Sequence, residues 1–236
     1  SEKVSNATLS VGRGLERLPR KALLLSSTAL TGAMLAAALT LPAGIAHAQQ
    51  AVVADGVDVV LDGLPQPIAG VKATNGGNIE GEGAEISLSG AHSAAVRADS
   101  GGTIGLTGGT VDKTGINSLG LRADGEGSAI RTDGVDITVT SRNAIGAQAT
   151  NGGEIELRGG KLSVSVEDVN ARHESDGALK AVGLGSRISA FDLEIEVTGS
   201  EALNPGISGG VRAQDGAEIS LDNVSIKTTG LTHGIR

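Results

Sequence analysis

The stretch Gly146–Leu157 reads GAQATNGGEIEL, and its twelve residues contain the pattern that decides the fold. A short segment ending in Ala149 leads into a turn sequence, Asn151-Gly152-Gly153, and then into Glu154-Ile155-Glu156-Leu157, in which polar and apolar residues alternate. Alternation with a period of two puts the apolar side chains on one face, as in a half-buried β-strand. Asn and Gly supply the positive φ angles that a sharp turn demands. The stretch therefore predicts a strand, a tight turn and a second strand.

The same pattern recurs along the chain. The copies are GVKATNGG from Gly70, AVRADSGG from Ala95, GLRADGEG from Gly120, GAQATNGG from Gly146, and the looser ALKAVGLG from Ala178 and GVRAQDGA from Gly210. Their anchoring alanines are spaced by 25, 25, 26, 32 and 32 residues and are Ala73, Ala98, Ala123, Ala149, Ala181 and Ala213. Gly234-Ile235-Arg236 repeats Gly210-Val211-Arg212, so we expect a seventh copy that is cut soon after it begins.

Each copy continues with a further alternating run, such as Leu162–Val166, Leu193–Val197 or Val224–Lys227. Two or three short strands cannot bury their apolar side chains alone, so each copy must pack on the copies before and after it. A parallel β-helix sets every strand beside its equivalent in the next copy. A meander or propeller is the alternative, but propeller blades have about 40 residues or more and usually carry aromatic motifs. The sequence therefore predicts an all-β, single-chain parallel β-helix over residues 49–236, with about six rungs and extra loops at Asp168–Asp176 and Gly199–Gly209.

The composition agrees with a stacked core of aliphatic side chains. The 236 residues include 37 Gly, no Trp, no Tyr, no Cys and a single Phe, Phe191. A hydrophobic fraction of 39% is too high for a disordered low-complexity chain. Without cysteine, neither disulfides nor thiolate metal sites can contribute.

Residues 1–48 have the order of a secretory signal peptide. Four basic residues in RGLERLPRK, residues 13–21, precede the uncharged segment Ala22–Leu41, and Ala46-His47-Ala48 offers a small-x-small cleavage site. A membrane-spanning anchor is the alternative, because about 20 apolar residues can cross a bilayer. Cleavage after Ala48 leaves 25 acidic and 14 basic residues, a net charge of −11. An acidic chain with a single aromatic side chain argues against nucleic acid as a partner.

The extended leader, the Gly-rich rungs of about 25 residues and the E-I-S-L type strands resemble a pertactin-like autotransporter passenger of bacterial type V secretion. The resemblance covers nearly the whole chain and concerns architecture and repeat style. It implies export through the inner membrane and display at the outer membrane or cell surface, or secretion, by way of a C-terminal outer-membrane barrel. No segment after Gln49 resembles that barrel. The chain is then expected to be the N-terminal part of a longer protein or the product of a truncated gene, and without a barrel its location is expected to be periplasmic.

No residue stands out as catalytic, cofactor-binding or metal-binding. Ser100, in Ala98-Asp99-Ser100-Gly101-Gly102, resembles the surroundings of a nucleophilic serine, but other copies place Asn75, Asn151 or Asp215 in the same slot, so a turn residue is predicted. Lys113-Thr114 follows Asp112 and not the glycine of a phosphate loop. The histidines lack the paired spacing of a zinc site and are His92, His173 and His233.

Two sets of charged residues leave alternatives open. The carboxylate pairs Glu154 with Glu156 and Glu194 with Glu196 share strand faces, as a glycosidase would require, but their alternation with isoleucine is typical of a solvated face. A basic residue recurs in register before the anchoring alanine, which predicts a row that could bind a polyanion or simply be solvated: Lys72, Arg97, Arg122, Lys180 and Arg212.

The leading functional hypothesis is a structural or adhesive passenger, not an enzyme, that contacts an unknown host or bacterial surface receptor and needs no cofactor. The alternatives are a polysaccharide-acting enzyme on a β-helix scaffold and a non-functional remnant of a truncated autotransporter. Insertions in solenoids project from one face and carry contacts. The loops Asp168–Asp176 and Gly199–Gly209 are therefore the places where adhesive contact is expected.

Overall fold

The structure is a computed structural model that describes residues 50–166, 176–199, 208–229 and 233–235. By its internal contacts the chain divides into two units, Ser1–Ile45 and Ala46–Arg236, and every described residue belongs to the second. The predicted signal peptide, residues 1–48, lies outside the described residues, as do most of the predicted loops Asp168–Asp176 and Gly199–Gly209. In the described part of the chain no helix is long and apolar enough to cross a membrane.

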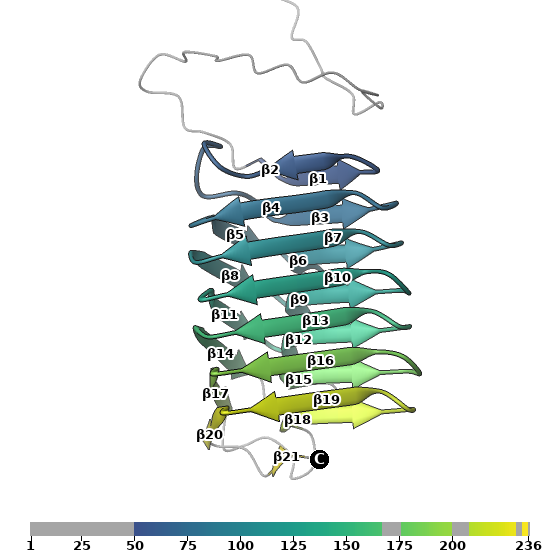
Figure 1. The fold of residues 1–236 in the computed structure, drawn as a ribbon. Coiled ribbons are helices and arrows are strands. Elements are labelled where there is room, and N and C mark those ends of the chain that lie inside the picture. Colours follow the sequence, from purple (N-terminus) through teal and green to yellow (C-terminus); the bar gives the residue numbers. More distant parts are fainter. Residues whose placement is uncertain (1–49, 167–175, 200–207, 230–232, 236) are drawn as a thin grey trace, which may run out of the picture. The chain divides into compact units, whose positions relative to one another are not determined.

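The described residues form three parallel sheets (Figure 1). The first sheet, sheet A, contains β1 (Val52–Asp55), β3 (Val71–Thr74), β6 (Ala94–Asp99), β9 (Ser118–Asp124), β12 (Ala144–Thr150), β15 (Asp176–Val182), β18 (Ser208–Gln214) and β21 (His233–Ile235). Sheet B contains β2 (Asp58–Val60), β4 (Asn78–Glu82), β7 (Thr103–Thr107), β10 (Ala129–Asp133), β13 (Glu154–Arg158), β16 (Arg187–Phe191) and β19 (Glu218–Asp222). Sheet C contains β5 (Glu85–Ser89), β8 (Thr110–Thr114), β11 (Asp136–Ser141), β14 (Lys161–Val166), β17 (Glu194–Gly199) and β20 (Ser225–Thr229).

From β3 to β20 each turn of the chain contributes one strand to each sheet, and the strands of the next turn pair with them; the first turn, with β1 and β2, adds no strand to sheet C. Every strand pairs in parallel with its equivalents in the neighbouring rungs, for example β10 with β7 and β13. Figure 1 shows the rungs stacked one below another from β1 and β2 to β18 and β19. The predicted parallel β-helix is confirmed. One rung lies before the first copy of the sequence repeat, because β1 pairs with β3 and places Ala54 beside Ala73.

The register turns the sequence repeat into vertical columns of identical or similar side chains. In sheet A the anchoring alanines stack, and six members of that column are fully buried: Ala54, Ala73, Ala98, Ala123, Ala149 and Ala181. In sheet B a column of isoleucines runs through Ile79, Ile104, Ile130, Ile155 and Ile188. Each member is at most 2% exposed. Burying a side chain of this size contributes about 1.5–3 kcal/mol, so the columns supply the core that no single rung could form.

Two rungs have a turn between sheets A and B that is one residue longer than the Asn-Gly-Gly turn, and a buried serine accommodates it. The Oγ of Ser128 donates to the carbonyl oxygen of Asp124 at 2.8 Å and accepts from the backbone N–H of Gly101 at 3.0 Å. Ser186 makes the same pair of bonds, to Val182 and Gly152, at 2.8 and 3.0 Å. The first of these longer turns explains why the third spacing of the repeat is 26 residues and not 25.

Lys113 occupies a core position in sheet C. Its register neighbours are Leu88 and Val139, and its side chain is fully buried. The ammonium donates to the carbonyl oxygens of Gly90 at 2.5 Å and Thr114 at 2.7 Å. Burial lowers the pKa of Lys113 below its ordinary value, because the charged form is poorly solvated there. The buried position of Lys113 was not predicted from the sequence, in which Lys113-Thr114 was compared only with a phosphate loop.

Candidate functional site

The predicted basic row is present on the outer face of sheet A. The strand register places Lys72 beside Arg97 and Arg97 beside Arg122, and continues through Gln148 to Lys180 and Arg212. Neighbouring strands lie about 4.8 Å apart, so the cations of successive rungs are close neighbours. The row is interrupted at Gln148, where the fourth copy of the repeat has an uncharged side chain.

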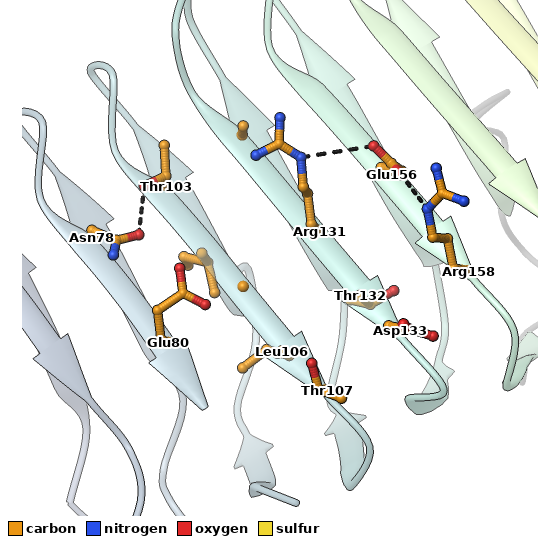
Figure 2. A pocket seen from close by; sticks show the side chains of 13 residues that line it. Asn78, Glu80, Thr103, Leu106, Thr107, Arg131, Thr132, Asp133, Glu156 and Arg158 are labelled. Atoms are coloured by element: carbon orange, nitrogen blue, oxygen red, sulfur yellow. Dashed lines mark hydrogen bonds and ion pairs between the residues drawn. The ribbon is translucent and has the colours of Figure 1, made fainter. Parts of the chain in front are cut away.

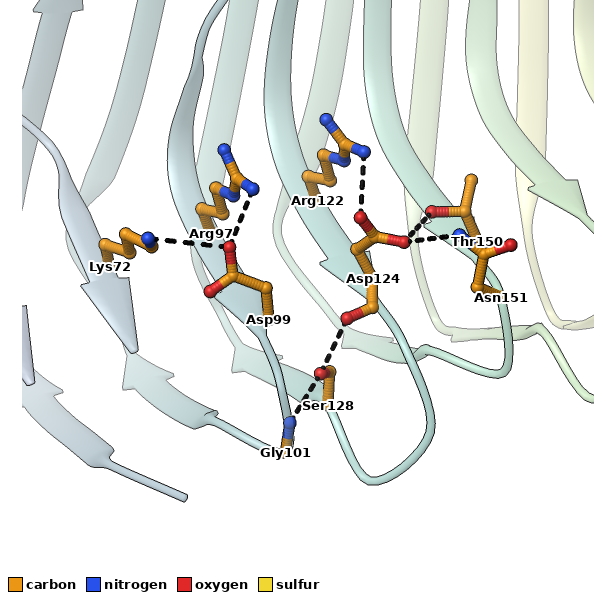
Figure 3. Close-up of polar contacts among 9 residues, drawn as sticks. All are labelled: Lys72, Arg97, Asp99, Gly101, Arg122, Asp124, Ser128, Thr150 and Asn151. Atoms are coloured by element: carbon orange, nitrogen blue, oxygen red, sulfur yellow. Dashed lines mark hydrogen bonds and ion pairs between the residues drawn. The ribbon is translucent and has the colours of Figure 1, made fainter. Parts of the chain in front are cut away.

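On β6 and β9 an acidic residue stands two positions after the basic one, and these two carboxylates pair with the first three cations of the row (Figure 3). Asp99 pairs with Arg97 at 2.7 Å and with Lys72 at 3.6 Å, and Asp124 pairs with Arg122 at 2.9 Å. Asp99 is 8% exposed, whereas the three cations remain a third or more exposed. Each pair therefore joins an accessible cation to a largely buried carboxylate.

Asp124 is held by a larger set of contacts than Asp99. Its Oδ1 accepts hydrogen bonds from the Thr150 hydroxyl and the Asn151 amide, both at 2.8 Å, while Oδ2 faces Arg122. Burial pushes the pKa of Asp124 upward, but these two hydrogen bonds and the charges of Arg122 and Arg97 outweigh it, so the pKa lies below its ordinary value. These contacts tie adjacent rungs together, and the two carboxylates compete with any polyanion for Lys72, Arg97 and Arg122.

The outer face of sheet B carries a shallow groove across strands β4, β7, β10 and β13 (Figure 2). The groove has a volume of about 370 Å³. Residues with small outward side chains form its floor, namely Thr103, Gly105, Thr107 and Ala129. Polar and charged side chains border it, namely Asn78, Glu80, Arg131, Asp133, Glu156 and Arg158. A second hollow of about 170 Å³ shares Ala129, Arg131 and Glu156 and extends to Arg187 and Ser189 on the same face.

Most polar groups at the rim of the groove form contacts with one another. The Thr103 hydroxyl donates to Oδ1 of Asn78 at 2.7 Å, and Glu156 pairs with Arg158 and, at 3.7 Å, with Arg131. Figure 2 shows Arg131 and Arg158 on either side of Glu156, and Glu80 on the other side of the floor. One side of the groove therefore carries the carboxylate of Glu80, and the other side carries the two guanidinium groups together with the carboxylates of Asp133 and Glu156.

The carboxylate pairs considered for glycoside hydrolysis lie on solvated faces, as their alternation predicts. Glu154 is exposed beside Glu156, which two arginines engage. Glu196 accepts from Lys161 and Lys227, and these hydrogen bonds and charges lower its pKa. A general acid needs a raised pKa, so the ion pairs of Glu196 suit a structural contact better than proton donation.

Several other residues singled out in the sequence have simple structural positions. Ser100 lies in the turn after β6 with φ of +51°, in the slot that holds Asn75 and Asn151 in other rungs, so the turn prediction is confirmed. His92 is exposed, and its Nδ1 lies 3.1 Å from the Asn117 amide. His173 lies outside the described residues. Among the residues that the structure describes, no three His, Cys, Asp or Glu side chains are grouped so as to hold a metal ion.

The groove was not predicted from the sequence. Its floor combines outward residues that lie about 25 positions apart, and it becomes visible only when the strand register brings them side by side. The signal that could have found it is the row Glu80, Gly105, Arg131, in which one rung has no side chain between two charged neighbours. Comparison of the chain with protein-family models, with curated proteins and with solved structures finds no match.

Proposed function

We propose that the chain is an exported β-helical passenger of the autotransporter type that acts structurally or adhesively at a cell surface. The observation that carries the proposal is the continuous apolar column inside polar outer faces, in which residues such as Ala123 and Ile130 are fully buried. A solenoid of this kind presents long, regular faces and loops to other molecules. The leader-like residues 1–48 and the resemblance of the repeats to passenger rungs support the same reading.

Export is tested first, with the full chain expressed in a Gram-negative host. The proposal predicts removal of residues 1–48, so intact-mass analysis finds a product that begins at Gln49 outside the inner membrane. Replacing the small residue before the cleavage point, Ala48→Phe, is expected to block processing, because signal peptidase accepts small residues there. Ala36→Leu, a change within the apolar segment, is the matched control and leaves cleavage unchanged. A full-length product that remains in the cytoplasm contradicts export.

Adhesion is tested separately, with beads coated with the purified protein and exposed to epithelial and bacterial cells. The proposal predicts that coated beads bind one of these cell types more than beads coated with an unrelated protein of similar charge. Shortening the segments at Asp168–Asp176 and Gly199–Gly209 to the length found in the 25-residue rungs is expected to weaken that binding. Equal binding of protein-coated and control beads to every cell type contradicts an adhesive role.

A further inference from the structure

The backbone conformation in the floor of the groove on sheet B does not require a glycine at position 105. Gly105 has no positive φ, so its conformation is open to other residues. It stands in an outward row with Glu80, Arg131 and Glu156 on adjacent rungs. A Cβ atom on Gly105 would lie 2.2 Å from Oε2 of Glu80, so the Glu80 side chain extends over the glycine. The missing side chain therefore sets the depth of the groove and the position of one of its carboxylates.

The neighbours of Gly105 extend this opening along β7. Thr103 and Thr107 flank it on the same strand, and Ala129 lies beside Thr103 on β10. Since each residue of a strand adds about 3.3 Å, the floor is on the order of 13 Å long. Its volume of about 370 Å³ lies at the lower end of the range for small-molecule sites, about 300–1,000 Å³. These dimensions suit a short, extended ligand lying along the strand.

The chemistry of the borders selects the class of ligand. Carboxylates such as Glu80 and Asp133 can only accept hydrogen bonds when ionised, whereas the guanidinium groups of Arg131 and Arg158 can only donate. The threonine hydroxyls of the floor can do both. A ligand covered with hydroxyl groups, each of which donates and accepts, can hydrogen-bond to both kinds of group at once. A polyanion would meet Glu80 and Asp133, and a polycation would meet Arg131 and Arg158.

We propose that the groove over Gly105 binds a short neutral oligosaccharide, which lies along β7 between the carboxylate of Glu80 and the guanidinium of Arg131. This inference rests on the proposed adhesive function for its biological setting, because it names the class of ligand that such a contact would use. The binding itself needs no export and no cell, so it is measured on the purified protein.

The test uses a panel of immobilised neutral oligosaccharides of two to six sugars, from glucose, galactose, mannose and N-acetylglucosamine series, with a heparin oligosaccharide and spermine as charged comparators. Gly105→Thr fills the floor with a side chain that β-strands favour, so the fold is retained while the groove is closed. Ser220→Thr is the matched control, because Ser220 lies in the same outward row, exposed and outside the groove. Circular dichroism and thermal unfolding confirm that both variants fold.

The proposal predicts binding of at least one neutral oligosaccharide by the wild-type protein, at least tenfold weaker binding by Gly105→Thr, and unchanged binding by Ser220→Thr. Glu80→Gln replaces a carboxylate, which only accepts hydrogen bonds, by an amide, and is expected to weaken the same binding. No binding to any neutral member of the panel, binding only to heparin or spermine, or equal binding by Gly105→Thr and wild type overturns the proposal. If the protein binds no neutral oligosaccharide but its coated beads adhere to cells, the groove is not the contact site and the adhesive function stands. If the protein binds an oligosaccharide but is neither exported nor adhesive, only the proposed function is refuted.

Discussion

The ammonium of Lys113 donates a hydrogen bond of 2.5 Å to the carbonyl oxygen of Gly90, inside a column whose neighbouring members are leucine and valine. Among the residues that the structure describes, no carboxylate forms an ion pair with this cation. The partners of the Lys113 ammonium are therefore the dipoles of two backbone carbonyl groups, at the bend that follows the strands of sheet C. A buried cation with only dipolar partners should cost stability relative to an apolar side chain of similar length.

Replacing Lys113 by methionine is expected to increase the free energy of unfolding by about 1 kcal/mol at pH 7. The carbonyls keep other partners, because the Gly90 N–H donates to the Thr114 oxygen at 3.1 Å and the Ser118 hydroxyl to the Gly90 oxygen at 3.4 Å. Denaturant unfolding of the two proteins measures the difference. A Lys113→Met variant that is clearly less stable than the wild type at pH 7 would show that the two hydrogen bonds outweigh the cost of burial.

The stability advantage of Lys113→Met should shrink as the pH rises. The pKa of Lys113 is lowered in the folded protein, whereas the unfolded chain titrates near 10.5. Between these two values the unfolded state binds the additional proton, so the wild type gains stability with increasing pH and the methionine variant does not. Unfolding curves at pH 7 and pH 10 test this sign, and a difference that grows with pH contradicts it.

Asp124 provides a test at acidic pH. Asp124→Asn removes the ion pair with Arg122 and weakens the acceptor for Thr150 and Asn151, so we expect a loss of about 1 kcal/mol at pH 7. The folded pKa lies below the ordinary 3.8, so the contribution of Asp124 is present above pH 3.8 and lost as the pH falls through the folded value. The variant should show a weaker acid dependence. Asp112→Asn, at an exposed outward position of β8, is the control and should behave as the wild type.

A substitution at Ser128 tests how much the hydrogen bonds of the buried turn contribute to stability. Ser128→Ala leaves the Gly101 N–H without its acceptor and the Asp124 carbonyl without its hydroxyl donor, in a position that is fully buried. An unsatisfied buried polar group costs about 1–3 kcal/mol, so thermal unfolding should shift to lower temperature. Exposed Ser220→Ala should leave the melting temperature nearly unchanged. An equal change of the melting temperature in the two variants would contradict the structural role of Ser128.

The aliphatic columns should dominate stability. Leu121 is fully buried in sheet A, and Leu121→Ala is expected to cost about 2–5 kcal/mol, from lost transfer free energy and the remaining cavity. Leu184 lies in a turn, is 85% exposed and provides the matched control, so Leu184→Ala should change the free energy of unfolding by less than about 0.5 kcal/mol. A comparable loss in both variants is incompatible with the core described here.

The spacing of the repeat was sufficient to predict the fold, because each anchoring alanine has to stack on its equivalent one rung away. It also predicted the basic row from Lys72 to Arg212, and the turn position of Ser100. These predictions rest on short-range alternation and on a fixed period, both of which are visible along the chain.

The remaining features depend on which distant residues the fold brings together. Lys113 has an inward position that alternation alone would assign, but a lysine there contradicts the expectation that charged residues face solvent. Ser128 and Ser186 are distinguished from other serines only by the longer turns that they close. The groove depends on the register of four strands, which joins Gly105 to Glu80 and Arg131 from different rungs.

The most direct test of the stacked-rung fold is a methyl NOE experiment on protein with labelled isoleucine δ1-methyl groups. In-register parallel strands about 4.8 Å apart bring the side chains of Ile104, Ile130 and Ile155 into contact in sequence order. The structure predicts cross-peaks between Ile104 and Ile130 and between Ile130 and Ile155, with a weak or missing cross-peak between Ile104 and Ile155. Absence of both sequential cross-peaks in a folded sample, or contacts that follow an antiparallel register, would contradict the parallel β-helix.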